Sequence, residues 1–146
     1  MRDKCFVLLG AIVCVLMSCS HVETYQQPLE NPQVMQLPNG HFRLLEPWRV
    51  RLQDASFTLQ KGYTCNGITA TDWQKAQMGH GADRKETWCA IFHDWTFTQG
   101  MSRQRCDDYF NELMIQYQVA PWKRELMYNI VKMRSAAKLV EQMSNE

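Results

Sequence analysis

Residues 84–98 read Arg-Lys-Glu-Thr-Trp-Cys-Ala-Ile-Phe-His-Asp-Trp-Thr-Phe-Thr, and their large apolar side chains recur at intervals of three and four residues. This spacing is typical of an amphipathic helix that packs one stripe against a core. The stripe consists of Trp88, Ile91, Phe92 and Trp95. Gln99-Gly100 follows, and glycine is well suited to the residue that closes a helix. The pattern therefore predicts a helix over residues 84–98.

Two further helices are predicted on the C-terminal side of this one. Ser102 is a good N-cap for the second helix, and Pro121 suits the first turn of the third. Both segments carry apolar residues at helical spacing. These residues are Cys106, Phe110, Leu113, Met114 and Tyr117 in the second helix, and Leu126, Ile130, Met133, Ala137 and Val140 in the third.

The segment on the N-terminal side alternates apolar and polar side chains, which is typical of strands with one buried face. The alternation covers residues 43–45, 48–52 and 56–60, and Asp54-Ala55 can turn the last two into a hairpin. Residues 61–83 contain four glycines and are expected to be rich in loops. A small set of antiparallel strands followed by three helices predicts an α+β fold.

The N-terminus has the organisation of an export signal. Arg2 and Lys4 precede the uncharged run Cys5–Met17, which is too short to span a bilayer because a helical span needs about twenty residues. The run ends in Leu16-Met17-Ser18-Cys19, which resembles the lipobox of bacterial lipoproteins. The resemblance implies that residues 1–18 are a signal peptide, that cleavage occurs before Cys19, and that Cys19 is acylated on its sulfur and its new amine.

Residues 19–38 are expected to be the lipidated N-terminus and a flexible tether. This segment contains Pro28, Pro32 and Pro38 and no apolar period. A single globular domain is predicted over residues 39–146, beginning at the turn pair Asn39-Gly40. The acyl chains would hold this domain on a bilayer, facing the periplasm. Ser20 after the lipidated cysteine is compatible with the outer membrane in enteric lipoproteins.

The charge of the chain argues against a nucleic-acid partner. Its formal net charge is +1 over 146 residues, and removal of Arg2, Asp3 and Lys4 with the signal would bring the mature chain close to neutral. A neutral surface has no bulk attraction for a polyanion. The partners that we expect are the lipid bilayer and an envelope protein or the cell wall.

Six cysteines are present, but Cys5 and Cys14 would leave with the signal and the sulfur of Cys19 would carry lipid. The remaining three are Cys65, Cys89 and Cys106. In an oxidising compartment one disulfide among them is possible, either Cys89–Cys106 or Cys65–Cys89. Three buried free thiols are an equally good expectation. The absence of a Cys-x-x-Cys pair in the sequence argues against a structural zinc site.

The most unusual polar feature is His93-Asp94 inside the aromatic stripe. Buried polar groups need partners, and Arg103 and Asp107 of the next helix are candidates to supply them. A functional interpretation makes His93, Asp94, Asp107 and Arg103 candidate catalytic residues, with His93 as general base. It also makes His80, His93 and Asp94 candidate ligands of zinc or another divalent metal. The alternative, which we favour, is a buried network that fixes the packing of two helices.

Several of these features form a set: Lys61–Thr69, His93-Asp94, Arg103, Asp107 and Arg124–Tyr128. Over about Phe57–Met133 the set resembles a small phage- and prophage-associated family of unknown function. Two departures stand out. The loop aspartate of that family is Asn66 here and its loop serine is Thr69, and the tyrosine that follows its His-Asp pair is replaced, with Phe97 nearby. Asn66 is a poorer metal ligand or acid than aspartate, which weakens a catalytic interpretation.

The lipobox combined with this domain also resembles prophage-encoded lipoproteins of the inner membrane whose overproduction triggers envelope stress signalling. Two functions therefore compete. The favoured one is a non-enzymatic accessory or interaction protein of the cell envelope. The alternative is a metal-dependent cell-wall hydrolase that uses His93 and Asp94. The sequence contains no His-Glu-x-x-His, Gly-x-Ser-x-Gly or P-loop motif to strengthen the alternative.

Overall fold

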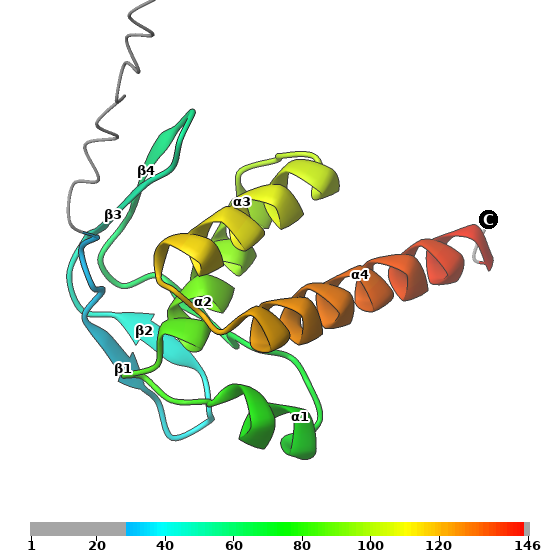
Figure 1. The fold of residues 1–146 in the computed structure, drawn as a ribbon, viewed down its shortest axis with the longest axis horizontal. Helices are drawn as coiled ribbons and strands as arrows, with labels where there is room; N and C mark the ends of the chain where they lie inside the picture. Colours follow the sequence, from blue (N-terminus) through cyan, green and yellow to red (C-terminus); the bar gives the residue numbers. More distant parts are fainter. Residues whose placement is uncertain (1–28, 145–146) are drawn as a thin grey trace, which may run out of the picture.

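The computed structural model describes residues 29–144, and the side chains of residues 29–134. Cys19 and the predicted signal peptide lie outside the described residues. Five strands precede four helices, and in Figure 1 the strands gather on one side while α4 extends away from them. The elements are β1 (Val34–Gln36), β2 (Phe42–Leu44), β3 (Trp48–Arg51), β4 (Ser56–Leu59), β5 (Thr64–Cys65), α1 (Asp72–Met78), α2 (Lys85–Thr98), α3 (Arg103–Gln116) and α4 (Pro121–Ser144). The predicted α+β class is confirmed.

The strands form two small antiparallel sheets. The first has the order β1-β2-β5, with Val34 opposite Leu44 and Phe42 opposite Cys65. The second is the predicted hairpin of β3 and β4, with Trp48 opposite Leu59. Along β3 the buried and exposed residues alternate, which is the pattern that led to the strand prediction.

The segment 61–83, predicted to be rich in loops, contains β5 and the short helix α1. Thr71 caps α1, and its side chain accepts from the backbone amide of Gln74 while the Gln74 side chain reaches back to the backbone amide of Thr71. This capping box satisfies two amides that the first turn would otherwise leave open. Most of the segment lies outside helices and strands, as predicted. The helix has seven residues, too few for an apolar period to be visible, which is why it was not predicted.

The described fold also extends beyond the boundary predicted at Asn39. Residues 34–36 form β1 although they were assigned to the tether. Four residues before β1, the backbone carbonyl of Glu30 accepts two hydrogen bonds, from Trp48 Nε1 at 2.9 Å and from the Tyr117 hydroxyl at 2.8 Å. Trp48 is buried in the core, so this segment satisfies an indole N–H that would otherwise be left without an acceptor.

The three predicted helices are α2, α3 and α4. Their apolar faces form most of the core, with Ile91, Phe92, Phe110, Leu113 and Met114 fully buried. The hydroxyl of Ser102 caps α3 as predicted, accepting from the amide of Arg105. Met133 of α4 is an exception, because it is 72% exposed rather than part of the apolar face. The side chains of Ala137 and Val140 lie outside those that the structure describes.

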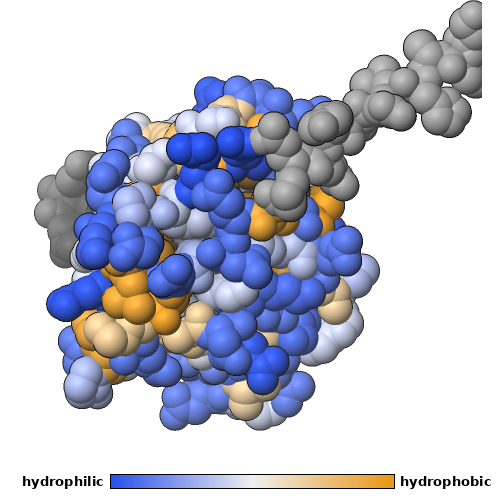
Figure 2. Space-filling view, turned by 90° about the vertical axis from the view of Figure 1, so that its left-hand side faces the viewer, coloured by the Kyte–Doolittle hydropathy of each residue, from blue (hydrophilic) through white to orange (hydrophobic). Residues whose placement is uncertain are grey.

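No helix within residues 29–144 has the length and apolarity needed to cross a membrane. The face shown in Figure 2 is mainly hydrophilic, with apolar side chains gathered in smaller groups between polar ones.

Candidate functional site

His93 of α2 and Asp107 of α3 form a buried hydrogen-bonded pair. His93 Nε2 lies 2.9 Å from Asp107 Oδ1, and the two side chains are only 8% and 4% exposed. The rings of Phe97 and Phe110 pack against the imidazole, with centroid distances of 4.8 and 4.7 Å. The structure thus joins two of the predicted site residues directly, across the interface between α2 and α3.

Burial lowers the pKa of His93, and this effect outweighs the hydrogen bond and charge of Asp107, which raise it. The charge of Arg103 lowers the pKa further. The imidazole is therefore neutral near pH 7. A neutral ring that bonds to a carboxylate through Nε2 must carry its hydrogen on that nitrogen. His93 then donates to Asp107 through Nε2, and its Nδ1 is the ring nitrogen that carries no hydrogen.

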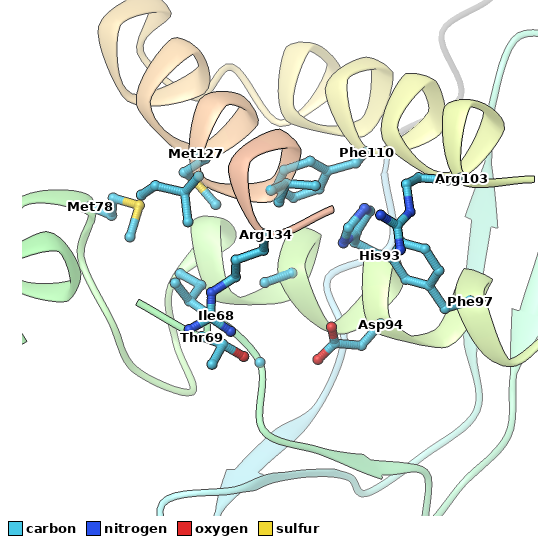
Figure 3. A pocket seen from close by; sticks show the side chains of 14 residues that line it. Ile68, Thr69, Met78, His93, Asp94, Phe97, Arg103, Phe110, Met127 and Arg134 are labelled. Carbon is cyan, nitrogen blue, oxygen red and sulfur yellow. The ribbon is translucent and has the colours of Figure 1, made fainter. Parts of the chain in front are cut away.

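A pocket of about 270 Å³ lies beside this pair, between α2, α3, α4 and the loop that follows β5 (Figure 3). Its walls are mostly apolar, and the buried ones among them are Ile68, Met78, Ala90, Phe110 and Met127. Five polar side chains also line it: Thr69, His93, Asp94, Arg103 and Arg134. A mainly apolar cavity with a few polar groups is the usual composition of a small-molecule site.

The polar side chains reach the pocket from different directions. In Figure 3 the carboxylate of Asp94 points into the cavity, and Arg134 extends from α4 towards Ile68 and Thr69. Arg103 lies at the other end, with its guanidinium 6.0 Å from the centre of the Phe97 ring. Arg134 is exposed, whereas Asp94 and Arg103 are half-buried. The charged groups therefore surround the opening, and the fully buried apolar groups form the interior.

Gly67 allows the loop after β5 to approach the core closely. Its φ is +63°, and a Cβ placed there would lie 2.9 Å from Cδ2 of Phe42. Any other residue would be strained in this conformation and would also collide with a buried ring. Gly67 thus fixes the path of the two residues that follow, Ile68 and Thr69, on the pocket wall.

Lys123 holds the helical walls of the pocket together. Its Nζ lies 2.9 Å from Oε1 of the buried Glu86 on α2 and 3.0 Å from the backbone carbonyl of Met78 at the end of α1. One ammonium group at the start of α4 thereby ties α4 to both α1 and α2. Charge-assisted bonds of this kind are among the stronger ones in proteins.

Asp94 lines the pocket and also interacts with Cys65 of the neighbouring strand β5. Burial, and then the charge and hydrogen bond of Asp94, raise the pKa of the Cys65 thiol to about 12. The pKa of Tyr63 is raised by burial and by the charges of Cys65 and Asp94. Because only a thiolate is a strong nucleophile, a thiol with a raised pKa is a poor candidate for covalent catalysis.

Cys89 and Cys106 are fully buried, and Cys65 is half-buried. The structure pairs none of the three, so each is a free thiol in it. Burial raises the pKa of both Cys89 and Cys106. In this arrangement they pack as small apolar residues, which is one of the two alternatives that the sequence left open.

The three predicted metal ligands are not all brought together. His93 and Asp94 line the pocket, but His80 does not, and its ring packs edge-on against Phe42 at a centroid distance of 5.1 Å. His80 Nε2 is buried and has no hydrogen-bond partner among the described residues. Among the described side chains, those of residues 29–134, no group of three or more His, Cys, Asp and Glu residues is placed to hold a metal ion.

The contribution of α4 to the pocket was not predicted from the sequence. Met127, Ile130, Val131 and Arg134 line it from one stripe of that helix, at intervals of three, one and three residues. This spacing was available in the sequence as an apolar face that ends in a cation. Met78 was missed because α1 was not predicted, and its capping box was the signal that could have identified that helix.

These features define a small α+β domain with a buried His-Asp pair beside an apolar pocket. The model of one protein family, described as a protein of unknown function (DUF1353), matches residues 42–131, which is more than half of the chain. The chain therefore belongs to the DUF1353 family. Comparison with curated proteins and with solved structures finds no match.

Proposed function

We propose that this protein is a lipid-anchored component of the bacterial cell envelope, of prophage type, that works as a non-enzymatic accessory or interaction protein. Its location rests on the lipobox at Leu16–Cys19. More than one acyl chain at Cys19 would make attachment stable, since each buried methylene contributes about 0.8 kcal/mol. The inner membrane follows from the resemblance to prophage lipoproteins, with the outer membrane as the alternative that Ser20 allows.

The observation that carries the non-enzymatic role is the buried pair of His93 and Asp107. A general base must reach the proton that it abstracts, but the His93 side chain is only 8% exposed and the rings of Phe97 and Phe110 pack against it. The thiol of Cys65, which is hydrogen-bonded to Asp94, has a raised pKa. These properties support a structural role for the pair and a binding role for the pocket beside it.

The attachment of the domain to its N-terminal segment supports a site of action near the membrane surface. Glu30 is bonded to Trp48 and Tyr117, and residues 20–29 lie between it and Cys19 in the sequence. If these residues form the flexible tether that the sequence predicts, their end-to-end distance would be roughly 17 Å. A partner of the domain should therefore lie on or close to the same membrane.

A metal-dependent cell-wall hydrolase is the second candidate, and one observation favours it: His93 and Asp94 line the same pocket. We do not prefer it, because among the side chains of residues 29–134 no third one joins these two to hold a metal. Cell-wall digestion by the purified protein separates the two candidates. We expect no release of wall fragments, with or without added zinc. Release that disappears in a folded His93→Ala variant would contradict the non-enzymatic proposal.

The anchor is tested by growing cells with an alkyne-tagged fatty acid and comparing two cysteine variants. We expect the wild-type protein and Cys14→Ala to be labelled and Cys19→Ala to remain an unlabelled precursor. Cys14→Ala is the matched control because it also removes one cysteine near the N-terminus. Labelling that persists in Cys19→Ala would refute the assignment. An envelope stress reporter should respond to overproduction of the wild type and not to Cys19→Ala.

A further inference from the structure

We propose that the pocket between α2, α3 and α4 binds a small carboxylate with an apolar body, the carboxylate at Arg134 and the apolar part against Met78, Phe110 and Met127. This inference goes beyond the proposed envelope role and does not depend on the lipid anchor. It rests on the shape, the charge and the rigidity of the pocket.

The interior of the pocket selects an apolar group of limited size. Met78, Phe110 and Met127 are each at most 2% exposed, and they belong to three different helices that meet there. A volume of about 270 Å³ holds roughly nine water-sized groups. Since an apolar cavity gains little by holding water, a short aliphatic or branched side chain is the occupant that it fits.

The opening of the pocket selects an anion. Two guanidinium groups, of Arg103 and Arg134, face a single carboxylate there, that of Asp94. Within the described side chains, those of residues 29–134, Arg134 forms no ion pair, and it extends over the cavity towards Thr69 (Figure 3). Guanidinium binds carboxylate through two parallel hydrogen bonds, and the Thr69 hydroxyl on the same wall can add a third.

The pocket is also held in place before any ligand arrives. Gly67 fixes the loop that carries Ile68 and Thr69, and the buried pair of His93 and Asp107 fixes α2 on α3. Lys123 ties α4 to α1 and α2. Preformed walls reduce the ordering that binding would otherwise require.

In a cell envelope, two kinds of molecule carry a carboxylate on an apolar body. They are a free fatty acid and the C-terminus of a peptide that ends in an apolar residue. The test titrates the isotopically labelled full chain, in detergent, with hexanoate and with N-acetyl-leucine, and follows the backbone amides by NMR. Both probes are short and charged, so they remain largely in water. Hexanamide is the neutral counterpart of hexanoate.

We expect at least one of the two acids to shift the amide signals of Ile68, Thr69 and Ala90. The preferred acid identifies the source. Hexanamide should bind about tenfold more weakly than hexanoate, and Arg134→Gln should weaken acid binding by about the same factor, because each change removes a charge-assisted bond. Arg49→Gln is the matched control. Arg49 is an exposed arginine of β3 that does not line the pocket, so its loss should leave the affinity unchanged.

Arg134 is exposed, so its substitution should not prevent folding. The proposal is overturned if neither acid shifts the pocket signals, if the amide binds as well as the acid, or if Arg134→Gln binds like the wild type. None of these outcomes would affect fatty-acid labelling at Cys19, so a failure of this inference can be told apart from a failure of the proposed function.

Discussion

Asp107 is a buried polar residue at the contact between α2 and α3. Its carboxylate lies in the apolar interface of α2 and α3, and His93 is the side chain that bonds to it there. The His-Asp pair could be anticipated from the sequence, because two polar residues on consecutive apolar helices need each other as partners. That Nε2 makes the contact, and that Asp94 instead points towards the pocket and Cys65, could not be predicted, since both depend on the rotation of α2 against α3.

Substitution of Asp107 by alanine should lower the free energy of unfolding by about 2–3 kcal/mol, because His93 would keep a buried N–H without an acceptor. Urea unfolding measures the change. Asp108→Ala is the control, since Asp108 is exposed and accepts a hydrogen bond from Gln104 on the same helix. It should shift stability by no more than about 0.5 kcal/mol. Equal effects of the two substitutions would show that the buried pair does not stabilise the fold.

The lowered pKa of His93 predicts a loss of stability in mild acid. An unfolded histidine takes up a proton near pH 6.5, whereas folded His93 does so only at lower pH because it is buried. Below about pH 6.5 the unfolded state therefore binds more protons, and the free energy of unfolding falls by up to about 1.4 kcal/mol per pH unit from this group.

His80 also has a lowered pKa, so the informative quantity is the difference between wild type and His93→Gln. Urea titrations between about pH 7.5 and 5.5 should show a shallower pH dependence in His93→Gln. His41→Gln, at an exposed position, should keep the wild-type dependence. A dependence unchanged by His93→Gln would contradict the assigned direction of the shift.

At the scale of elements, the long amphipathic helices and the alternating strands were predictable from their periodicity. Helix α2 covers residues 85–98 and α3 covers residues 103–116, within a few residues of the predicted segments. The hairpin of β3 and β4 also agrees with its prediction. The elements that were missed are the shortest helix, α1 with seven residues, and two strands, β1 with three and β5 with two. Strands as short as β1 and β5 are stabilised by their partners in space rather than by a local pattern.

The position of β1 predicts where the N-terminal segment can be shortened. Deleting residues 20–28 from the full chain should leave the melting temperature unchanged, because the hydrogen bonds described here begin at Glu30. Deleting residues 20–38 removes β1 and the acceptor of both Trp48 and Tyr117. This longer deletion should lower the free energy of unfolding by at least about 2 kcal/mol. If both deletions are equally harmless, β1 does not contribute to the stability of the domain.

The whole molecule combines a described domain that has a pocket with a proposed lipid anchor. The match to the DUF1353 family covers residues 42–131, most of the described fold, and the proposed anchor lies outside that range. The pocket combines residues from a loop and four helices, so no single stretch of sequence could have revealed it. The proposed anchor, in contrast, rests on one contiguous motif, Leu16–Cys19, so it could be proposed from the sequence alone.

Mass spectrometry of the N-terminal peptide, taken from the membrane fraction of cells that express the full chain, tests the proposed lipid anchor at Cys19. We expect a peptide that begins at Cys19 and carries a diacylglyceryl group on sulfur together with an acylated amine. A peptide that still begins at Met1 and carries no lipid would contradict both the location and the favoured role.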